Sequence, residues 1–364
     1  MSSSCEPLAS LDNERYGRGL ADRIRSQRVP FSGSLALTHR CNLDCVHCYV
    51  KEKPHGSPLA PELDMRQWQK IIGEIRDAGC LNLLLTGGEP LLREDFPEIY
   101  TFAKRSGFLV TVFTNGTRIS ERIVELFRSL PPRLVEISLY GSNPEINDRI
   151  TGCPGSFAES LRGIRMLLSA GIAVQLKSIL MTLNNDDFPA LESLAQSLGL
   201  KFRFDPAIFP TLSGDHSPIA LRVSPERAVE LEMAEPGKIR EWQEFVQSFS
   251  AGLEDEGSYN CGSGINTFHV DAHGWLFPCQ MVGTAKYRLD PGSFLEGWRQ
   301  AFNDFRSDPL RPEMPCRNCA DKLLCGYCPG FFKMENGSEQ APSAYLCAIG
   351  RSRRMKINST SAGG

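Results

Sequence analysis

Three closely spaced cysteines stand in one loop near the start of the chain, Cys41-Asn-Leu-Asp-Cys45-Val-His-Cys48. An apolar run typical of a strand, residues 34–38, leads directly into this loop. Thiolates are soft ligands that select iron–sulfur clusters, zinc or copper(I). Because a cubane iron–sulfur cluster is usually held by four cysteines, three cysteines would leave one iron open to another ligand. A zinc knuckle without its fourth ligand, or cysteines with no shared role, are the alternatives.

With His47 before the last cysteine and Tyr49 after it, this C-x3-C-x2-C loop resembles that of the radical S-adenosylmethionine (SAM) superfamily. The resemblance implies a 4Fe–4S cluster on the three cysteines, whose open iron binds the amino and carboxylate groups of SAM beside His47 and Tyr49. An electron from the cluster, supplied by an external donor such as flavodoxin or ferredoxin, would then cleave SAM to a 5′-deoxyadenosyl radical. In such enzymes the cofactor carries the difficult chemistry and the protein positions it.

A glycine-rich segment, Gly87-Gly88-Glu89-Pro90, directly follows a second apolar run over residues 82–86. Glycines allow a backbone to approach a ligand closely, and the carboxyl end of a strand is the functional end in an α/β barrel. The resemblance implies that this segment binds the SAM ammonium group, through backbone carbonyls and Glu89.

Three more residues at or near strand ends are candidate SAM contacts: Asn115, Ser138 and Lys177. Asn115 belongs to an Asn-Gly pair, for which an ordinary turn is the alternative. Ser138 begins Ser-Leu-Tyr-Gly, where relatives commonly read Ser-Leu-Asp-Gly, so Tyr140 replaces a carboxylate. Lys177 lies in an apolar strand, and either reaches the SAM carboxylate or snorkels to an end of the barrel.

Seven further cysteines gather in the last third of the chain and include a C-x2-C-x5-C-x2-C run that begins at Cys316. This pattern resembles the SPASM extension of radical SAM enzymes, which carries auxiliary 4Fe–4S clusters, although relatives more often have three residues before the last cysteine of the run. The resemblance implies a total of three clusters. The distal cluster would use Cys316, Cys319, Cys325 and Cys347, and the proximal cluster Cys261, Cys279 and Cys328. Zinc is the alternative, because paired C-x2-C units also suit a tetrahedral ion.

Seven cysteines do not divide into two sets of four, which indicates one incompletely ligated site. We hypothesise that the proximal cluster has an open iron or a non-cysteine ligand such as Glu256 or Asp255. An open iron could bind a substrate thiolate or accept an electron from a substrate radical.

Strand and helix patterns alternate from residue 34 onward. Strands are predicted over residues 34–38, 82–86, 109–114, 134–139, 173–181 and 201–208, and helices over residues 64–78, 95–106, 120–129, 156–170 and 186–198. Six strands alternating with helices predict a parallel α/β architecture, in which a strand such as 82–86 is buried on both faces. Periodicity leaves a doubly wound sheet open, whereas the resemblance favours a partial (β/α)6 barrel followed by a cysteine-rich iron–sulfur SPASM domain.

Composition divides the chain into five predicted parts. Residues 1–33 form an N-terminal extension with a short helix near 15–25, and residues 34–208 form the barrel. Residues 209–257 are a bridging helical segment, interrupted at Pro236-Gly237. Residues 258–350 are the auxiliary-cluster domain, where strand and helix signals are weak and metal clusters would supply the missing cross-links. Residues 351–364 are predicted to be a disordered tail.

The overall composition limits the partners and the compartment. The chain has 364 residues, 41% of them hydrophobic, and a net charge of −3, a near-neutral balance that argues against nucleic acid as a partner. No apolar stretch approaches the length of a membrane span, and residues 1–28 lack a secretory apolar core, so we expect a cytoplasmic protein. Disulfides are rare there, so thirteen cysteines favour metal binding or catalysis.

Together the two cysteine motifs predict an iron–sulfur oxidoreductase that uses SAM to abstract a hydrogen atom. SPASM enzymes mainly modify ribosomally made peptides, so the resemblance implies a thioether bond, a carbon–carbon cross-link or an oxidised side chain. The auxiliary clusters would take up the electron left after radical coupling.

Gln280 separates the chain from one branch of that group. Anaerobic sulfatase maturases carry an aspartate base directly after the cysteine that matches Cys279, and a neutral amide cannot accept a proton usefully. An enzyme acting on a tetrapyrrole or a sugar, and a catalytically inactive peptide-binding scaffold, are the alternatives. A scaffold would yield no 5′-deoxyadenosine from SAM.

Overall fold

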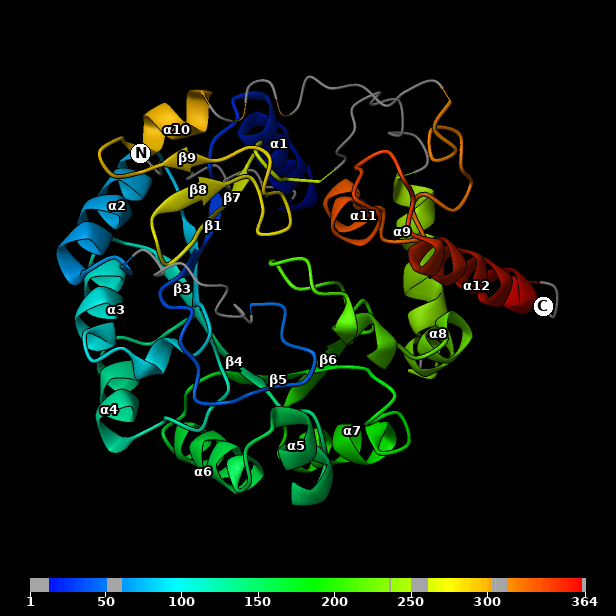
Figure 1. The fold of residues 1–364 in the computed structure, drawn as a ribbon, viewed down its shortest axis with the longest axis horizontal. Helices are drawn as coiled ribbons and strands as arrows, with labels where there is room; N and C mark the ends of the chain where they lie inside the picture. Colours follow the sequence, from blue (N-terminus) through cyan, green and yellow to red (C-terminus); the bar gives the residue numbers. More distant parts are fainter. Residues whose placement is uncertain are drawn as a thin grey trace, which may run out of the picture.

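A computed structural model describes residues 13–50, 61–235, 237–249, 261–300, 302, 305 and 313–361. Six parallel strands lie side by side in chain order and form an inner layer (Figure 1). They are β1 (Ser32–Ala36), β2 (Asn82–Thr86), β3 (Leu109–Thr114), β4 (Leu134–Ser138), β5 (Val174–Ile179) and β6 (Lys201–Asp205). Their order and direction confirm the predicted α/β partial barrel.

Helices surround the strands as an open ring in Figure 1. They include α2 (Met65–Asp77), α3 (Phe96–Arg105), α4 (Glu121–Ser129), α5 (Pro144–Thr151), α6 (Ser156–Ser169) and α7 (Phe188–Ser197). Capping sets their ends: Asp64 and Gln67 form a reciprocal capping box at the start of α2. The sequence-based prediction lacks α5, because eight residues that start at a proline show little periodicity. The helix expected near residues 15–25 is present as α1 (Asn13–Ser26).

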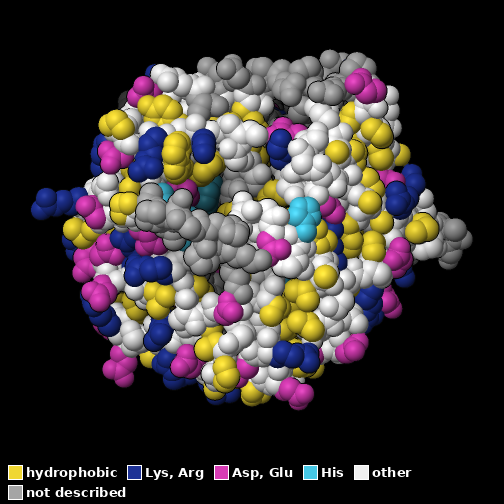
Figure 2. All heavy atoms as spheres, viewed as in Figure 1, with side chains coloured by type: hydrophobic (Ala, Val, Ile, Leu, Met, Phe, Trp, Pro, Cys, Tyr) yellow, Lys and Arg dark blue, Asp and Glu magenta, His cyan; other side chains and the backbone are white. Residues whose placement is uncertain are grey.

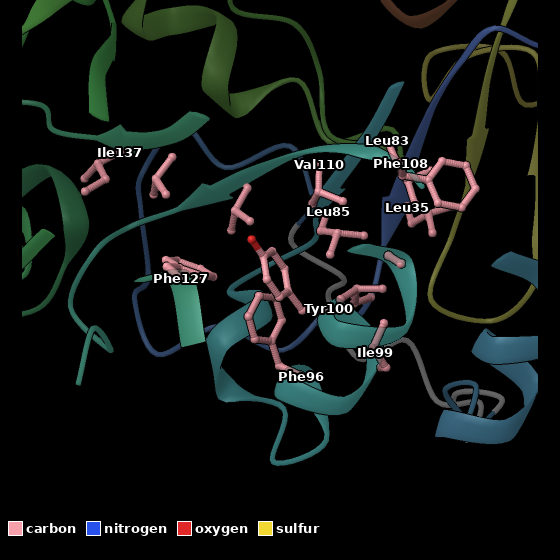
Figure 3. Close-up of a cluster of buried hydrophobic side chains, with 14 of the residues drawn as sticks. Leu35, Leu83, Leu85, Phe96, Ile99, Tyr100, Phe108, Val110, Phe127 and Ile137 are labelled. Atoms are coloured by element: carbon pink, nitrogen blue, oxygen red, sulfur yellow. The ribbon is translucent and has the colours of Figure 1, made fainter. Parts of the chain in front are cut away.

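Side chains alternate along the strands between a packed core and a hollow interior. Leu83 and Leu85 of β2 are at most 1% exposed, whereas Leu84 faces a cavity on the other side of the strand. The prediction that this strand is buried on both faces is therefore wrong, because the inner face of the barrel is hollow. Figure 3 shows the core side, where strand residues pack against the aromatic side chains Phe96, Tyr100 and Phe127 of α3 and α4.

Three short strands from the last third of the chain extend the same sheet. β7 (Thr267–Val270) pairs in parallel with β1, and β8 (Trp275–Phe277) and β9 (Tyr287–Arg288) follow in antiparallel order. Gly33 of β1 allows this packing, because a Cβ there would lie only 2.1 Å from the ring of Phe268. The sequence gives only weak strand signals here, because these strands are stabilised by pairing in the sheet that includes β1 and less by local propensity. The division of the chain at residue 258 stays a prediction.

The remaining helices are α8 (Pro225–Met233), α9 (Lys238–Phe249), α10 (Phe294–Gln300), α11 (Pro329–Asn336) and α12 (Ala344–Ser361). Four of these helices follow β6 or lie in the C-terminal part of the chain, whereas α10 packs against α2 and β8. The break between α8 and α9 lies where Pro236-Gly237 predicts it. The predicted disordered tail is wrong over residues 351–361, which belong to α12. This helix is held by tertiary contacts, because Arg353 pairs with Glu232 of α8 at 2.8 Å and lies over the ring of Trp242 in α9.

A buried ion pair connects the loop before α8 to α11. The guanidinium Nη1 of Arg222 lies 2.7 Å from Glu335 Oε1, and the two side chains are 8% and 14% exposed. Arg222 also donates from Nε to the carbonyl of Ile208 at 2.7 Å, and it lies over the rings of Phe331 and Tyr345. One side chain thereby joins the end of the barrel to the segment that carries the C-terminal cysteines.

The surface shows charges of both signs. Figure 2 shows basic and acidic side chains interspersed around the face of the molecule that looks toward the viewer, in keeping with a net charge of −3. In the part of the chain that the structure describes, no helix combines the length and the apolar character that crossing a bilayer requires.

Candidate functional site

A cavity of about 1080 Å³ lies against the inner face of the strands. Cys41, Cys45 and Cys48 line it, and so does Cys279 from the C-terminal group of cysteines. The fold therefore brings the two cysteine motifs to one space. The predicted SAM contacts that also line this cavity are His47, Tyr49, Gly87, Gly88, Asn115, Ser138 and Lys177. Glu89 and Pro90 lie behind its wall and are buried.

Gly87 and Gly88 bring the end of β2 against the backbone that leads into the cysteine loop. The Gly88 amide donates to the Thr38 carbonyl at 2.7 Å, and the Glu89 amide donates to the Arg40 carbonyl at 2.9 Å. A Cβ at Gly87 would lie 2.3 Å from the Thr38 oxygen, and one at Gly88 would lie 2.3 Å from the Arg40 oxygen. The two glycines therefore allow the backbone after β2 to lie directly against the backbone that leads into the cysteine loop.

Glu89 is fully buried and joins the ends of two strands. Its Oε1 accepts hydrogen bonds from Thr114 Oγ1 at 2.8 Å and from the Leu91 amide at 3.0 Å, and its Oε2 accepts one from the Asn115 amide at 2.7 Å. Burial raises the pKa of this carboxyl group to about 7, against the opposing effect of those donors. The contact with the SAM ammonium group stays a prediction.

We expect Glu89→Gln to lower the free energy of unfolding by about 1–3 kcal/mol, because an amide nitrogen would face buried donors and leave one of them without an acceptor. Urea unfolding of the full chain measures this change. Glu94→Gln is the control, since Glu94 is exposed and its substitution should change the value by less than about 0.5 kcal/mol. Equal stability of the two variants would contradict a supporting role for Glu89.

Asn115 ties the end of β3 to the cysteine loop. Its Nδ2 donates to Asn42 Oδ1 at 3.1 Å and to Cys41 Sγ at 3.9 Å. Its Oδ1 accepts a hydrogen bond from the Thr117 amide at 2.9 Å, which closes a local turn. Asn115 therefore forms a turn and also lies beside the predicted cluster site. Its contact with SAM stays a prediction.

Tyr140 lies beside all three cysteines of the loop. Its hydroxyl group forms a hydrogen bond with Ser138, and its ring meets the His47 ring edge-on at a centroid distance of 4.5 Å. Burial raises the pKa of Tyr140 well above its usual range, and the thiolates of the three cysteines add to the rise. A neutral phenol therefore stands where relatives commonly carry a carboxylate.

Lys177 belongs to an ion-pair network on the cavity wall. Its Nζ lies 3.4 Å from Glu136 Oε1 and 3.8 Å from the centroid of the Phe113 ring. Arg203 donates from Nε to Glu136 Oε2 at 2.7 Å, and Glu136 itself is buried. Burial lowers the pKa of Lys177, and Glu136 opposes this shift. One buried carboxylate thus holds two cations at the cavity. The sequence analysis did not single out Arg203, because its role depends on a partner from β4.

The C-terminal cysteines influence one another electrostatically within each of the two predicted sets, and the assignment of these sets to clusters stays a prediction. Burial raises the thiol pKa of Cys325 to about 12, and the thiolates of Cys347, Cys316 and Cys319 add to this rise. Burial likewise raises the thiol pKa of Cys328 to about 11, and Cys279 and Cys261 add to it. These mutual effects place each set within one electrostatic neighbourhood. Asp255 and Glu256 lie outside the described residues.

The donor set of these cysteines suits an iron–sulfur cluster or zinc, because both take thiolate ligands. Binding of either would displace the thiol protons that burial retains.

A hydrogen bond joins the two cysteine motifs across the cavity. Tyr49, which follows Cys48, donates from its hydroxyl group to Gln280 Oε1 at 3.3 Å. Burial raises the pKa of Tyr49 to about 12, so the donor keeps its proton. Gln280 therefore acts as an acceptor at the position where sulfatase maturases carry an aspartate.

Three histidines that the sequence analysis did not single out also line the cavity: His39, His269 and His273. The rings of His39 and His273 meet edge-on at 5.1 Å, and His269 Nδ1 lies 2.8 Å from Ser34 Oγ. Burial lowers the pKa of His269 to about 4, so this ring is neutral at pH 7. The sequence does not predict the pairing of β7 with β1. These three histidines are therefore seen to lie together only in the structure.

Comparisons with known proteins agree with this geometry. The family model of the radical SAM superfamily matches residues 35–198. The chain is 30% identical over 337 residues to the AdoMet-dependent heme synthase of Oleidesulfovibrio alaskensis, covering 84% of each chain. It is 26% identical over 340 residues to the antilisterial bacteriocin subtilosin biosynthesis protein AlbA of Bacillus subtilis, covering 90% of this chain and 73% of AlbA.

The solved structures show the same fold. The crystal structure of Streptococcus suis SuiB bound to its precursor peptide SuiA superposes with a TM-score of 0.68 at 16% identity. It covers 95% of this chain and 83% of that one. The family assignment rests on the cysteine loop after β1, the glycine-rich turn after β2 and relatives that match across most of both chains. The chain belongs to the radical SAM superfamily and is an enzyme of its SPASM-containing group.

Proposed function

We propose that Cys41, Cys45 and Cys48 hold a 4Fe–4S cluster and that the adjoining cavity holds SAM and the substrate. When bound, cluster and SAM supply the 5′-deoxyadenosyl radical that removes a hydrogen atom from the substrate. The chain's own residues position these groups. Gly87 and Gly88 fix the backbone that approaches the loop, and Lys177 presents a cation to a carboxylate in the cavity.

Auxiliary 4Fe–4S clusters on the C-terminal cysteines are the second part of this proposal. Cys279 carries it, because this residue lines the same cavity as the three cysteines of the loop. The proximal cluster would use Cys261, Cys279 and Cys328, and the distal cluster would use Cys316, Cys319, Cys325 and Cys347. A substrate held between the two motifs would then have a radical source on one side and an electron acceptor on the other.

A ribosomally made peptide is the proposed substrate. AlbA, a bacteriocin biosynthesis protein, matches 90% of this chain, and SuiB, whose fold the chain shares, binds a precursor peptide. The cavity volume of about 1080 Å³ lies at the upper end of the range for small-molecule sites, which leaves room for a peptide side chain beside SAM. A thioether or carbon–carbon cross-link, or a related oxidation, is the proposed product.

Formation of a cross-link removes two hydrogen atoms from the peptide. The 5′-deoxyadenosyl radical takes the first as a hydrogen atom, and the second leaves as a proton and an electron when the new bond forms. The electron would pass to a cluster held by the auxiliary cysteines and onward to an external carrier. Gln280 cannot take the proton, whereas His39 and His273 on the cavity wall carry imidazole groups, which are chemically suitable acceptors.

A Cys279→Ala variant tests the role of the auxiliary site. The reconstituted full chain, given reductant, SAM and each short peptide encoded beside its gene, should form 5′-deoxyadenosine and a peptide lighter by two hydrogen atoms. We expect the variant to keep SAM cleavage and to lose the modified peptide by at least about tenfold. Mass spectrometry measures both products. Undiminished peptide modification by the variant would contradict an electron-accepting role for this site.

A tetrapyrrole is the second candidate substrate. The heme synthase matches 84% of both chains, and the cavity holds Lys177 and Arg203, two cations that suit propionate groups. Incubation with an iron porphyrin that carries propionates, followed by absorption spectra and mass spectrometry, separates the candidates. Porphyrin conversion without peptide modification would replace the peptide proposal.

A further inference from the structure

The cysteine loop is also held by an element other than the turn at Gly87 and Gly88. The Asp44 amide donates to the Thr151 carbonyl at 2.8 Å, and the Val46 amide donates to the Ile150 carbonyl at 3.0 Å. Asp44 and Val46 flank Cys45, while Ile150 and Thr151 form the last turn of α5. The middle cysteine of the loop is therefore bracketed by two hydrogen bonds to one helix end.

Gly152 makes this approach possible. It ends α5 in the left-handed region, with φ of 66° and ψ of 14°. A Cβ at this position would lie 2.9 Å from the Asp44 carbonyl oxygen and 3.2 Å from the Asp44 Cβ. A real Cβ cannot approach a backbone oxygen so closely, so any side chain at residue 152 must push the cysteine loop away from α5.

A buried polar network fixes the turn that carries Gly152. The Ser156 hydroxyl group donates to Asp148 Oδ1 at 2.8 Å, lies 2.7 Å from Thr151 Oγ1 and accepts a hydrogen bond from Asn147 Nδ2 at 3.0 Å. Thr151, Ser156 and Asn147 are each at most 2% exposed. Buried polar groups that are fully paired in this way hold one conformation, because each alternative leaves a group unsatisfied.

The same helix also holds the wall beside the thiols. Asn147 Oδ1 accepts a hydrogen bond from the Tyr140 amide at 3.0 Å, and the Tyr140 ring meets the ring of His47 in the cysteine loop at a centroid distance of 4.5 Å. At Gly141 a Cβ would lie 2.7 Å from the Asn147 amide nitrogen, so the segment that follows β4 is in backbone contact with α5 here. Helix α5 thus contacts both the loop and the aromatic wall behind it.

We propose that α5 acts with Thr151, Gly152 and Ser156 as a clamp that sets the spacing of Cys41, Cys45 and Cys48 for cluster assembly. Thr151, Gly152 and Ser156 are positioning residues in this view, since none of them reaches the cavity. The inference depends on the cluster site in the loop and is independent of the substrate proposed above.

Gly152→Ala tests the clamp, and Gly155→Ala is its matched control. Both glycines have positive φ, so both substitutions carry the same kind of backbone strain, about 1–2 kcal/mol. A Cβ at Gly155 meets nothing within 4 Å. Only Gly152→Ala should therefore displace the loop. We expect it to lose about 4 of roughly 12 irons per reconstituted chain, together with the change that SAM produces in the electron paramagnetic resonance spectrum of the reduced cluster.

Hydrogen exchange of the Asp44 and Val46 amides gives a readout without catalysis. We expect exchange to accelerate on the order of tenfold in Gly152→Ala and to stay unchanged in Gly155→Ala. Unchanged iron content and an unchanged spectral response to SAM in Gly152→Ala would overturn the clamp. Equal losses in both variants would overturn it too, because strain alone would then explain the effect.

Retention of the remaining irons shows that the variant still folds. Should Gly152→Ala lose all of its iron, Ser156→Ala decides the question, because it removes one hydroxyl group without adding an atom. Loss of the SAM-responsive signal with the other irons retained supports the clamp, and a full wild-type signal refutes it. Neither result depends on finding a substrate, so the clamp and the peptide proposal fail separately.

Discussion

A variant with alanine at Cys41, Cys45 and Cys48 will release no 5′-deoxyadenosine from SAM and will hold about 8 irons in place of roughly 12. The iron is lost because the variant lacks all three thiolates of the loop. Among the described cysteines, Cys279 alone would remain in the cavity lining. The four irons of the SAM cluster would disappear, and the auxiliary irons would remain on separate cysteines.

Iron, sulfide and zinc analysis after anaerobic reconstitution, with chromatography of the nucleoside product, measures this result. Cys153→Ala is the control, since Cys153 belongs to none of the three predicted groups. It should keep all of its iron and its SAM cleavage. A wild-type chain with about 4 irons and with zinc in the C-terminal sites would contradict the auxiliary clusters.

Arg222→Ala should lower the free energy of unfolding by about 3–5 kcal/mol, the cost of leaving the other member of a buried ion pair without its partner. Glu335 is 14% exposed and would lose its ion-pair partner in a site that excludes most water. The variant also loses the hydrogen bond to the Ile208 carbonyl and the packing on Phe331 and Tyr345. Urea unfolding of the reconstituted chain measures the change.

Two further variants make this test specific. Arg227→Ala removes an exposed pair with Glu230, whose side chains are 33% and 59% exposed, and should cost no more than about 1 kcal/mol. Arg222→Met combined with Glu335→Leu removes both charges and should recover much of the loss. If Arg222→Ala behaves like Arg227→Ala, the ion pair does not anchor α11 to the barrel.

The sequence alone determined the features that depend on local chemistry. Residue types and short spacings can be read from the sequence without a structure. They identified the C-x3-C-x2-C loop, the Gly87-Gly88 turn and the C-terminal cysteine run. Five of the six helices from α2 to α7 could also be predicted, since amphipathic periodicity and caps such as Asp64 act within one element. Helix α5 was not predicted from the sequence, because a helix of eight residues has too few turns to show a clear period.

Tertiary structure alone decided which residues meet. The C-terminal strand β7 pairs with β1, which places His269 and Cys279 in the cavity of the cysteine loop. Arg203 from β6 and Lys177 from β5 share Glu136 from β4, and α12 continues through the predicted tail because Arg353 finds Glu232. Such contacts join residues far apart in sequence, and their energies depend on burial and on partners. No local pattern encodes either quantity, because both arise only when the chain has folded.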